Sequence, residues 1–269
     1  MRNFPTFFFK CTIYISLIYL TFLLLRFAIF DYYIVIGESM NPSFRNGEKV
    51  VVNKLRLGPR IIFRFSNKDN FHIKRLPGLS KLKVGEIVVA NYPYPKFEDR
   101  ISFDKNYVYL KRCYGAPGDT VSIVEGYYKN SNVQGPLGDV TYQRQLSYLK
   151  DSVLLEKGII LKSLQQTEPY DWTIRNFGPL YVPRRGDYIK IDSSNYLIWH
   201  NIILFETGKS LSSRNGHIFL DNKIIKGYTF NSNWYFLGGD NVLNSKDSRY
   251  IGLFPESFII GIVMRRSPN

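Results

Sequence analysis

The sequence has little cysteine, few histidines and fewer acidic than basic side chains. Its 269 residues include only 2 cysteines and 3 histidines. Cys11 lies in an apolar N-terminal run and Cys113 in the part of the chain beyond it, so we expect no internal disulfide. His72, His200 and His217 do not have the spacing of metal ligands. We therefore expect neither a metal site nor a cofactor.

The shortage of acidic residues leaves a strongly basic chain. With 36 Lys and Arg against 22 Asp and Glu, the formal net charge is +14 and the isoelectric point is near 9.6. Such a balance first suggests a nucleic-acid partner. The basic residues are scattered in ones and twos, however, and no zinc finger, helix-turn-helix or RNA-binding signature accompanies them. We expect no nucleic acid, and an anionic lipid surface as the partner instead.

There is one long apolar run, and it lies near the N-terminus. Cys11 to Leu25 carries no charge, is bounded by Lys10 and Arg26, and has bulky apolar residues on both sides. With the basic ends snorkelling, residues 7–30 are long enough to cross a bilayer, which needs about 20 residues. We assign residues 1–31 to a short N-terminal segment and a transmembrane helix.

A cleavable signal peptide is the alternative interpretation of this run. No small-x-small cleavage pattern follows it, since residues 27–36 are bulky apart from Ala28, so we favour a permanent anchor. Arg2 and Lys10 precede the run. By the positive-inside bias, the N-terminus is expected in the cytoplasm and the rest of the chain outside it.

Beyond residue 31 the chain is predicted to be mainly β. Short alternating runs follow turn signals, as expected for sheets or a partly open barrel. A short helix is expected within residues 149–164, with Val153, Leu154, Ile160 and Leu161 inward. Aromatic residues of the middle region have two interpretations, core packing or seating at lipid headgroup depth. The expected strands are Lys49 to Lys54, Ile87 to Tyr92, Tyr107 to Cys113, Thr120 to Val124, Tyr188 to Asp192 and His217 to Leu220.

Two segments contain residue types suited to nucleophilic catalysis. Ser39 lies in the turn-like run Gly37 to Phe44, shortly after the apolar segment. The alternation of Tyr107 to Cys113 puts Lys111 on one strand face between Tyr109 and Cys113. A desolvated lysine can activate a serine hydroxyl. Taken alone, a serine in such a segment most often belongs to an ordinary turn, and a strand lysine is usually solvated.

Four segments in order resemble the boxes of the bacterial type I signal peptidases, which are membrane-anchored Ser/Lys endopeptidases. The resemblance covers Tyr33 to Val263 except for a variable middle. The segments are Ile36 to Phe44 (IGESMNPSF), Gly85 to Val89 (GEIVV), Tyr109 to Asp119 (YLKRCYGAPGD) and Gly239 to Gly252 (GDNVLNSKDSRYIG).

The resemblance implies a role for each matching residue. Ser39 is the expected nucleophile, Lys111 the general base, and Ser245 the hydrogen-bonding residue that orients the lysine amine. Asp247 and Arg249 are expected to form an ion pair that braces this site, together with Asp240. The substrate is expected to bind as an extended strand, with shallow pockets for small residues before the cut. The expected substrate-contacting residues are Val35, Ile36, Met40, Tyr109 and Leu110.

The sequence departs from the family pattern at two positions. Val242 replaces the arginine that usually follows Gly-Asp-Asn, where no catalytic role falls. Gly37 stands where some members have a serine that donates a second hydrogen bond to the oxyanion. The oxyanion hole is then expected to consist mainly of the Ser39 backbone N–H. In other enzymes, the loss of one oxyanion donor costs roughly 3 kcal/mol of transition-state stabilisation.

The resemblance predicts a membrane-bound serine endopeptidase that removes signal peptides from exported preproteins. It implies a bacterial cytoplasmic membrane, with the catalytic domain on the extracytoplasmic side. The catalytic core is expected in residues 32–124 and 226–269, with an inserted β subdomain at 125–225. One alternative is a membrane-tethered binding or scaffold protein on a degenerate peptidase fold. Another is a self-cleaving Ser/Lys protease, which needs a DNA-binding module that is not recognisable here.

Overall fold

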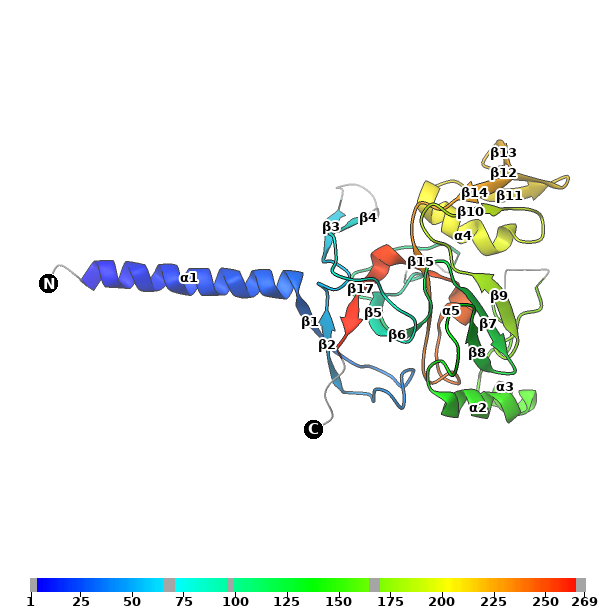
Figure 1. Ribbon diagram of the computed structural model, residues 1–269, viewed down its shortest axis with the longest axis horizontal. Helices are drawn as coiled ribbons and strands as arrows, with labels where there is room; N and C mark the ends of the chain where they lie inside the picture. Colours follow the sequence, from blue (N-terminus) through cyan, green and yellow to red (C-terminus); the bar gives the residue numbers. More distant parts are fainter. Residues whose placement is uncertain (1–3, 65–70, 96–98, 165–169, 265–269) are drawn as a thin grey trace.

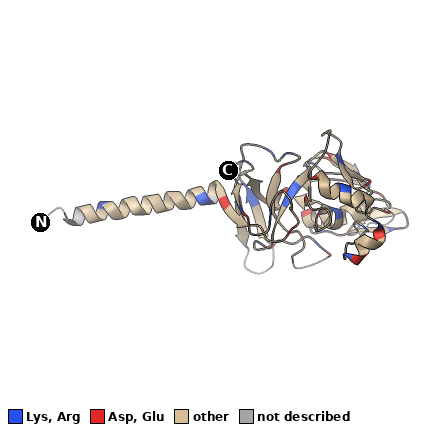
Figure 2. Ribbon diagram, turned by 90° about the horizontal axis from the view of Figure 1, so that it is seen from below, with Lys and Arg blue, Asp and Glu red and all other residues tan. Residues whose placement is uncertain are grey.

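The computed structural model describes residues 4–64, 71–95, 99–164 and 170–264. Helix α1 (Phe4–Ala28) extends away from a body that contains all the other elements (Figure 1). Its segment Phe7–Arg26 is long and apolar enough to cross a membrane. The helix ends at Ala28 and strand β1 begins at Phe30, so the predicted spanning segment, residues 7–30, is slightly too long. Figure 2 shows an almost uncharged helix with a basic position near each end.

The main sheet has seven strands in the order β1, β2, β17, β5, β6, β15, β16, all paired antiparallel. The prediction of a mainly β fold is confirmed. The sheet brings β6, which carries Lys111, beside β15, which leads into the last box. The bounds are β1 Phe30–Ile34, β2 Lys49–Asn53, β17 Ile259–Val263, β5 Ile87–Asn91, β6 Val108–Gly115, β15 Trp234–Gly238 and β16 Phe254–Pro255.

Most of the remaining elements form a second region beside this sheet, whereas the strands Arg60–Arg64 and Phe71–Arg75 lie near β17 (Figure 1). Strand β7 (Thr120–Val124) lies between β8 (Tyr127–Asn130) and β9 (Phe177–Tyr181). Small sheets pair β10 with β14 and β3 with β4, and β12 lies between β11 and β13 in a three-stranded sheet. Their bounds are β10 Tyr188–Lys190, β14 Gly227–Thr229, β11 Leu211–Arg214, β12 His217–Leu220, β13 Lys223–Ile225, β3 Arg60–Arg64 and β4 Phe71–Arg75. The helices are α2 Val140–Tyr148, α3 Asp151–Glu156, α4 Tyr196–Thr207 and α5 Ser248–Ile251, with a 3-10 turn at Glu256–Phe258.

The predicted helix in residues 149–164 is only partly correct. Helix α3 covers Asp151–Glu156 alone, because Gly158 takes φ +72° just beyond it. Leu154 is buried as expected, whereas Ile160 is 52% exposed. Asp139 caps helix α2, which the sequence analysis did not predict, by accepting the Thr141 N–H at 2.9 Å.

The region expected as an inserted β subdomain contains three helices as well as strands. Helix α4 was missed because its run is apolar on nearly every side, which resembles a buried strand. Its buried residues Trp199, Ile202 and Ile203 nevertheless have helical spacing. Strand β7 precedes residue 125 and pairs with β8 and β9 beyond it. The region is therefore joined to the core through a shared sheet.

The middle-region aromatics mostly pack inside the body. Tyr128, Trp172 and Trp199 are buried in the largest core cluster. Tyr128 stacks on Tyr114 with ring centroids 3.9 Å apart. Tyr148 and Tyr188 are exceptions in this region, being 65% and 63% exposed.

Candidate active site

Ser39 lies in a turn that follows β1. Val35 closes the base of this turn, because its N–H donates to the Glu48 carbonyl and its carbonyl accepts the Gly47 N–H, both at 2.8 Å. Gly37 takes φ +88°, a conformation that favours glycine, and its N–H donates to Asn46 Oδ1 at 2.9 Å. The buried Met40 side chain anchors the far side of the turn.

Lys111 reaches Ser39 from the middle of β6. Its Nζ lies 2.8 Å from the Ser39 Oγ, although the two residues are 72 positions apart in sequence. The Lys111 side chain is buried and lies 5.1 Å from the centroid of the Tyr109 ring. The predicted strand face is therefore correct, and the structure places the two predicted catalytic groups in contact.

The surroundings of Lys111 favour its neutral amine. Burial lowers the pKa of Lys111 from about 10.5 to about 8. Asp247 opposes this shift by attraction, Arg249 supports it by repulsion, and Asp240 opposes it more weakly. About half of the Lys111 amine is thus uncharged near pH 8, as a base requires.

Asp247 and Arg249 form the predicted ion pair. Their atoms Oδ1 and Nε lie 2.8 Å apart, and both side chains are fully buried. Arg249 also donates to the Val242 carbonyl at 2.9 Å, and Asp247 accepts the Gly239 N–H at 3.1 Å. The pair thus holds both ends of the loop that follows β15. Val242 contributes only its backbone carbonyl to this arrangement, so this contact does not depend on the side chain at position 242.

Ser245 lies near the catalytic pair but does not make the predicted hydrogen bond. Its Oγ is buried and makes no hydrogen bond of ordinary geometry within the described part of the chain, although it interacts with the Asp247 carboxylate and helps to lower the pKa of that group. A Cβ at Gly239 would lie 2.4 Å from both the Ser245 Oγ and the Ser39 carbonyl oxygen. Glycine is therefore needed at 239 for the last box to approach the nucleophile. The hydroxyl is in the right region to turn toward the lysine amine, and that role stays a prediction.

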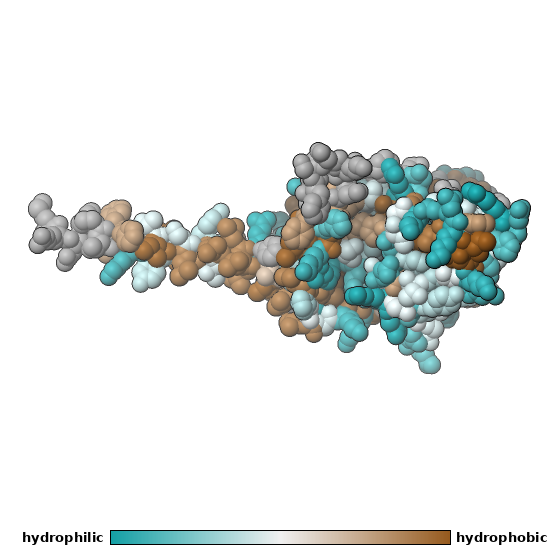
Figure 3. Space-filling view, turned by 90° about the horizontal axis from the view of Figure 1, so that it is seen from above, coloured by the Kyte–Doolittle hydropathy of each residue, from teal (hydrophilic) through white to brown (hydrophobic). Residues whose placement is uncertain are grey.

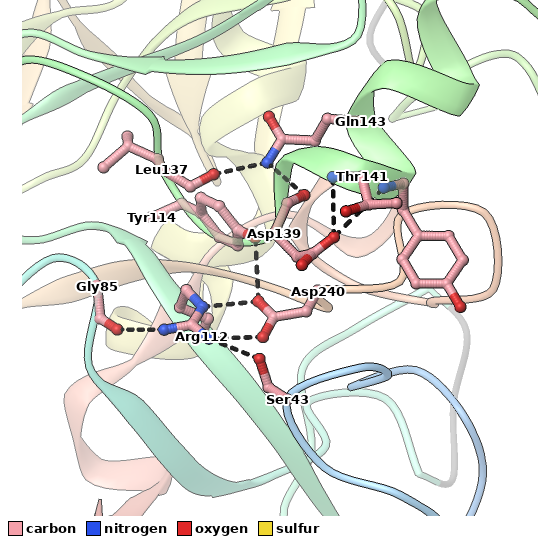
Figure 4. A network of polar contacts seen from close by, with 10 residues as sticks. Ser43, Gly85, Arg112, Tyr114, Leu137, Asp139, Thr141, Gln143 and Asp240 are labelled. Atoms are coloured by element: carbon pink, nitrogen blue, oxygen red, sulfur yellow. Dashed lines mark hydrogen bonds and ion pairs between the residues drawn. The ribbon is translucent and has the colours of Figure 1, made fainter.

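Asp240 braces the site through a partner that the sequence analysis did not predict. Arg112 Nε and Nη2 donate to its two carboxylate oxygens at 2.6 and 2.5 Å. Arg112 also donates to the Ser43 Oγ at 3.1 Å and to the Gly85 carbonyl at 2.7 Å (Figure 4). Arg112 points to the opposite face of β6 from Lys111. It therefore connects its own box to the other three boxes, on the strand face opposite to Lys111.

Asn241 is a second functional candidate that was missed. Its backbone N–H donates to the Ser39 carbonyl at 3.1 Å, and its Nδ2 donates to the Glu38 carbonyl at 3.3 Å. The Glu38 carbonyl and the Ser39 N–H belong to one planar peptide and point in opposite directions. By holding that carbonyl, Asn241 fixes the direction of the N–H that was predicted to stabilise the oxyanion.

The predicted substrate-contacting residues differ in exposure. Ile36 is 89% exposed, Val35 and Met40 are buried, and Tyr109 and Leu110 are half-buried. Strand β6 pairs with β5 along Val108 to Arg112, but on its other side β15 covers it only from Arg112 onward. Among the described strands, none pairs with that other edge of Val108 to Leu110, so a backbone edge is free beside Ser39.

Histidine and metal chemistry lie outside this arrangement. The His200 ring bonds to the Leu211 carbonyl in the second region at 3.1 Å. Within the ranges that the structure describes, no three His, Cys, Asp or Glu side chains form a group suited to a metal ion. The arrangement is a serine and lysine pair, braced by two buried carboxylates that each pair with an arginine.

The chain is similar to known signal peptidases. The chain is 24% identical over 248 residues to a signal peptidase I of Buchnera aphidicola, covering 88% of this chain and 68% of that protein. It is 25% identical over 243 residues to signal peptidase I T of Bacillus subtilis, covering 89% and 74%. A crystal structure of a signal peptidase I from Enterococcus faecalis aligns with 17% identity and a TM-score of 0.28, covering 69% of this chain and 98% of that one. The family model described as signal peptidase, peptidase S26, matches residues 8–266. The chain therefore belongs to the signal peptidase family, peptidase S26.

Proposed function

We propose that Ser39 and Lys111 perform the hydrolysis of this serine endopeptidase, which cleaves signal peptides. The observation that carries the proposal is the 2.8 Å contact between the Lys111 Nζ and the Ser39 Oγ, made inside a buried site. A binding or scaffold protein has no need for a lysine whose pKa burial has lowered to about 8. No feature of the described residues favours the scaffold alternative.

The reaction follows the chemistry of a serine and its base. Neutral Lys111 takes the Ser39 proton while the Ser39 Oγ attacks the carbonyl carbon of the cleaved bond. The resulting oxyanion accepts a hydrogen bond from the Ser39 N–H. Lys111 then gives the proton to the leaving amine, so the C–N bond breaks and the signal peptide remains as an ester on Ser39. Water, deprotonated by Lys111, hydrolyses that ester and releases the serine.

The free edge of β6 provides a place for the substrate backbone. The signal peptide adds an extended strand along Val108 to Leu110, beside Val35 and Ile36, with its cleaved bond at Ser39. The half-buried Tyr109 and Leu110 and the buried Met40 border this path. We infer that little room is left for large side chains immediately before the cut, which favours alanine there.

The position of α1 indicates how the enzyme meets its substrate. Ser39 follows the end of α1 by about ten residues, so an anchored helix holds the nucleophile near the membrane surface. The apolar surface of α1 continues onto the adjoining part of the body (Figure 3). There β1 exposes Tyr32 and Ile34 at 69% and 60%. We infer a bacterial cytoplasmic membrane with the N-terminus in the cytoplasm, the body outside and this surface seated on lipid.

The test compares full-length protein in detergent with a purified preprotein as substrate. Ser39→Ala is expected to lower cleavage by at least a thousandfold while leaving the melting temperature near that of the native protein. Ser152→Ala, which changes an exposed serine on α3, serves as the matched control and is expected to cleave normally. Cleavage by Ser39→Ala at the native rate would refute the assignment.

A further inference from the structure

A cavity of about 620 Å³ lies between the last box and the second region of the body. Its walls come from several parts of the chain that are far apart in sequence. They include the segment after β5 at Tyr92 and Tyr94, helix α4 at Ile198 and Ile202, and the last box from Leu243 to Lys246. No residue that we assign to the signal-peptide side is among the described residues that line it.

The cavity reaches the last box beside the catalytic pair. Ser245 lines it, and the Ser245 Oγ is buried without a hydrogen bond of ordinary geometry in the described residues. The Lys246 Nζ lies 5.6 Å from the centroid of the Tyr92 ring, which lies 4.7 Å from the Tyr109 centroid. The Tyr109 centroid is in turn 5.1 Å from the Lys111 Nζ. The Nζ atoms of Lys246 and Lys111 are therefore no more than about 16 Å apart. About five residues of extended chain can span that distance.

The topology of the sheet determines which part of a substrate reaches this cavity. A substrate strand on the free edge of β6 ends at Arg112, because β15 pairs with β6 from that residue onward. The chain beyond the cleaved bond must leave the sheet there. The loop that follows β15 leads from Gly239 to Ser245 and Lys246, at the cavity. Lys111 also gives its proton to the leaving amine, so the new N-terminus forms on the lysine side.

The lining indicates the chemistry of the ligand. Most of the wall is aliphatic or aromatic, so it suits an apolar side chain. The charged residues among the described lining are Lys157 and Lys246, and both are positive. A carboxylate near an apolar side chain is complementary to this wall, whereas a lysine or arginine is repelled by it.

We propose that this cavity binds the first five or so residues of the mature protein, just after the cleaved bond, and prefers an acidic residue among them. The proposal rests on the proposed function, since it needs Ser39 and Lys111 to mark the position of the cleaved bond. It assigns a specificity role to Lys246. The cavity would hold the mature segment during acylation and release it with the amine product.

The experiment uses full-length enzyme in detergent and preproteins that differ at one position. Glutamate or lysine is placed in turn at each of positions two to five of the mature segment, and kcat/KM is measured for each. For the native enzyme we expect the glutamate substrate to be cleaved about three- to tenfold more efficiently at one or more of these positions. Lys246→Glu is expected to reverse that order. Lys223→Glu makes the same charge change on exposed strand β13, outside the cavity, and is expected to keep the native order.

Each other outcome has a defined meaning. Equal cleavage of all substrates by the native enzyme, with Ser39→Ala inactive, would refute the cavity proposal and leave the proposed function intact. An inactive native enzyme, or an active Ser39→Ala, would refute the proposed function itself. A native preference that Lys246→Glu left unchanged would show that Lys246 does not set it, and would overturn the proposal. If Lys223→Glu reversed the preference equally, the preference would come from the net charge of the protein, and the cavity proposal would be wrong.

Discussion

The backbone N–H of Asn241 donates a 3.1 Å hydrogen bond to the carbonyl oxygen of Ser39, so the last box holds the nucleophile by its main chain. The Asn241 side chain holds the preceding carbonyl of Glu38 at 3.3 Å. The last box thus positions the peptide that presents the oxyanion donor, in addition to bracing the lysine through its ion pair.

Asn241→Ala is therefore expected to lower kcat about tenfold with little change in KM. The substitution keeps the backbone bond and removes the one to Glu38, so the Ser39 N–H loses part of its fixed direction. Steady-state cleavage of a preprotein measures both constants. Asn222→Ala, in the exposed turn between β12 and β13, is the control. A change in KM alone would mean that Asn241 contributes to substrate binding instead.

Arg112→Met is expected to destabilise the fold by about 3 kcal/mol, because it leaves the fully buried Asp240 carboxylate without its ionic partner. Urea denaturation monitored by fluorescence measures the loss. The double variant Arg112→Met with Asp240→Asn removes the uncompensated charge and is expected to recover part of it. If the double variant lost as much as both single changes added together, the two residues would not be coupled.

Local turn chemistry made some elements predictable from sequence. The strand expected at His217 to Leu220 has those bounds in the structure, because the Asn215-Gly216 turn before it is a strong hairpin signal. Both turn residues take positive φ, 49° and 76°, as that turn requires. The strand face of Lys111 followed equally from alternation alone.

Long-range pairing was not predictable in the same way. Arg112 and Asp240 are 128 positions apart, and only the sheet order that places β6 beside β15 brings them together. The resemblance indicated that Asp240 braces the site but not which residue it meets. Helix α4 was missed for a different reason, since an evenly apolar run does not distinguish a buried helix from a buried strand.

The exposed apolar residues of β1 are expected to bind lipid independently of α1. A chain beginning at Phe30 should fold, because β1 and all later elements remain, and should sediment with anionic vesicles less strongly at high salt. Tyr32→Asp with Ile34→Asp is expected to weaken this binding several-fold. Ile224→Asp changes a 53% exposed isoleucine on β13 and is the control. Equal binding by all three chains at every salt concentration would exclude β1 as the seating surface.

Lys111→Met is expected to stabilise the protein while abolishing cleavage. Burial lowers the pKa of Lys111 to about 8, so below pH 8 the folded state carries a charged amine that would be better solvated in the unfolded chain. That cost is roughly 3 kcal/mol below pH 8 and vanishes above pH 10.5, where the amine is neutral in both states. Melting temperatures of the variant and the native protein should therefore differ most near pH 7 and converge toward pH 10.5. A difference that did not change with pH would point to packing rather than charge.

The rate of cleavage is expected to rise with pH through an apparent pKa near 8 and then level off, because only neutral Lys111 accepts the Ser39 proton. Arg249 carries a positive charge that helps keep the amine neutral, so Arg249→Met should move this limb to higher pH if the fold is retained. Asp247→Asn should move the rise in rate to lower pH, since it removes an attraction that favours the ammonium form of Lys111.

Replacing His72, His200 and His217 one at a time should leave the acidic limb of the pH profile in place. Values of kcat/KM measured between pH 6 and 10 will show this. A limb that disappeared with one histidine would transfer the base role from Lys111 to that residue.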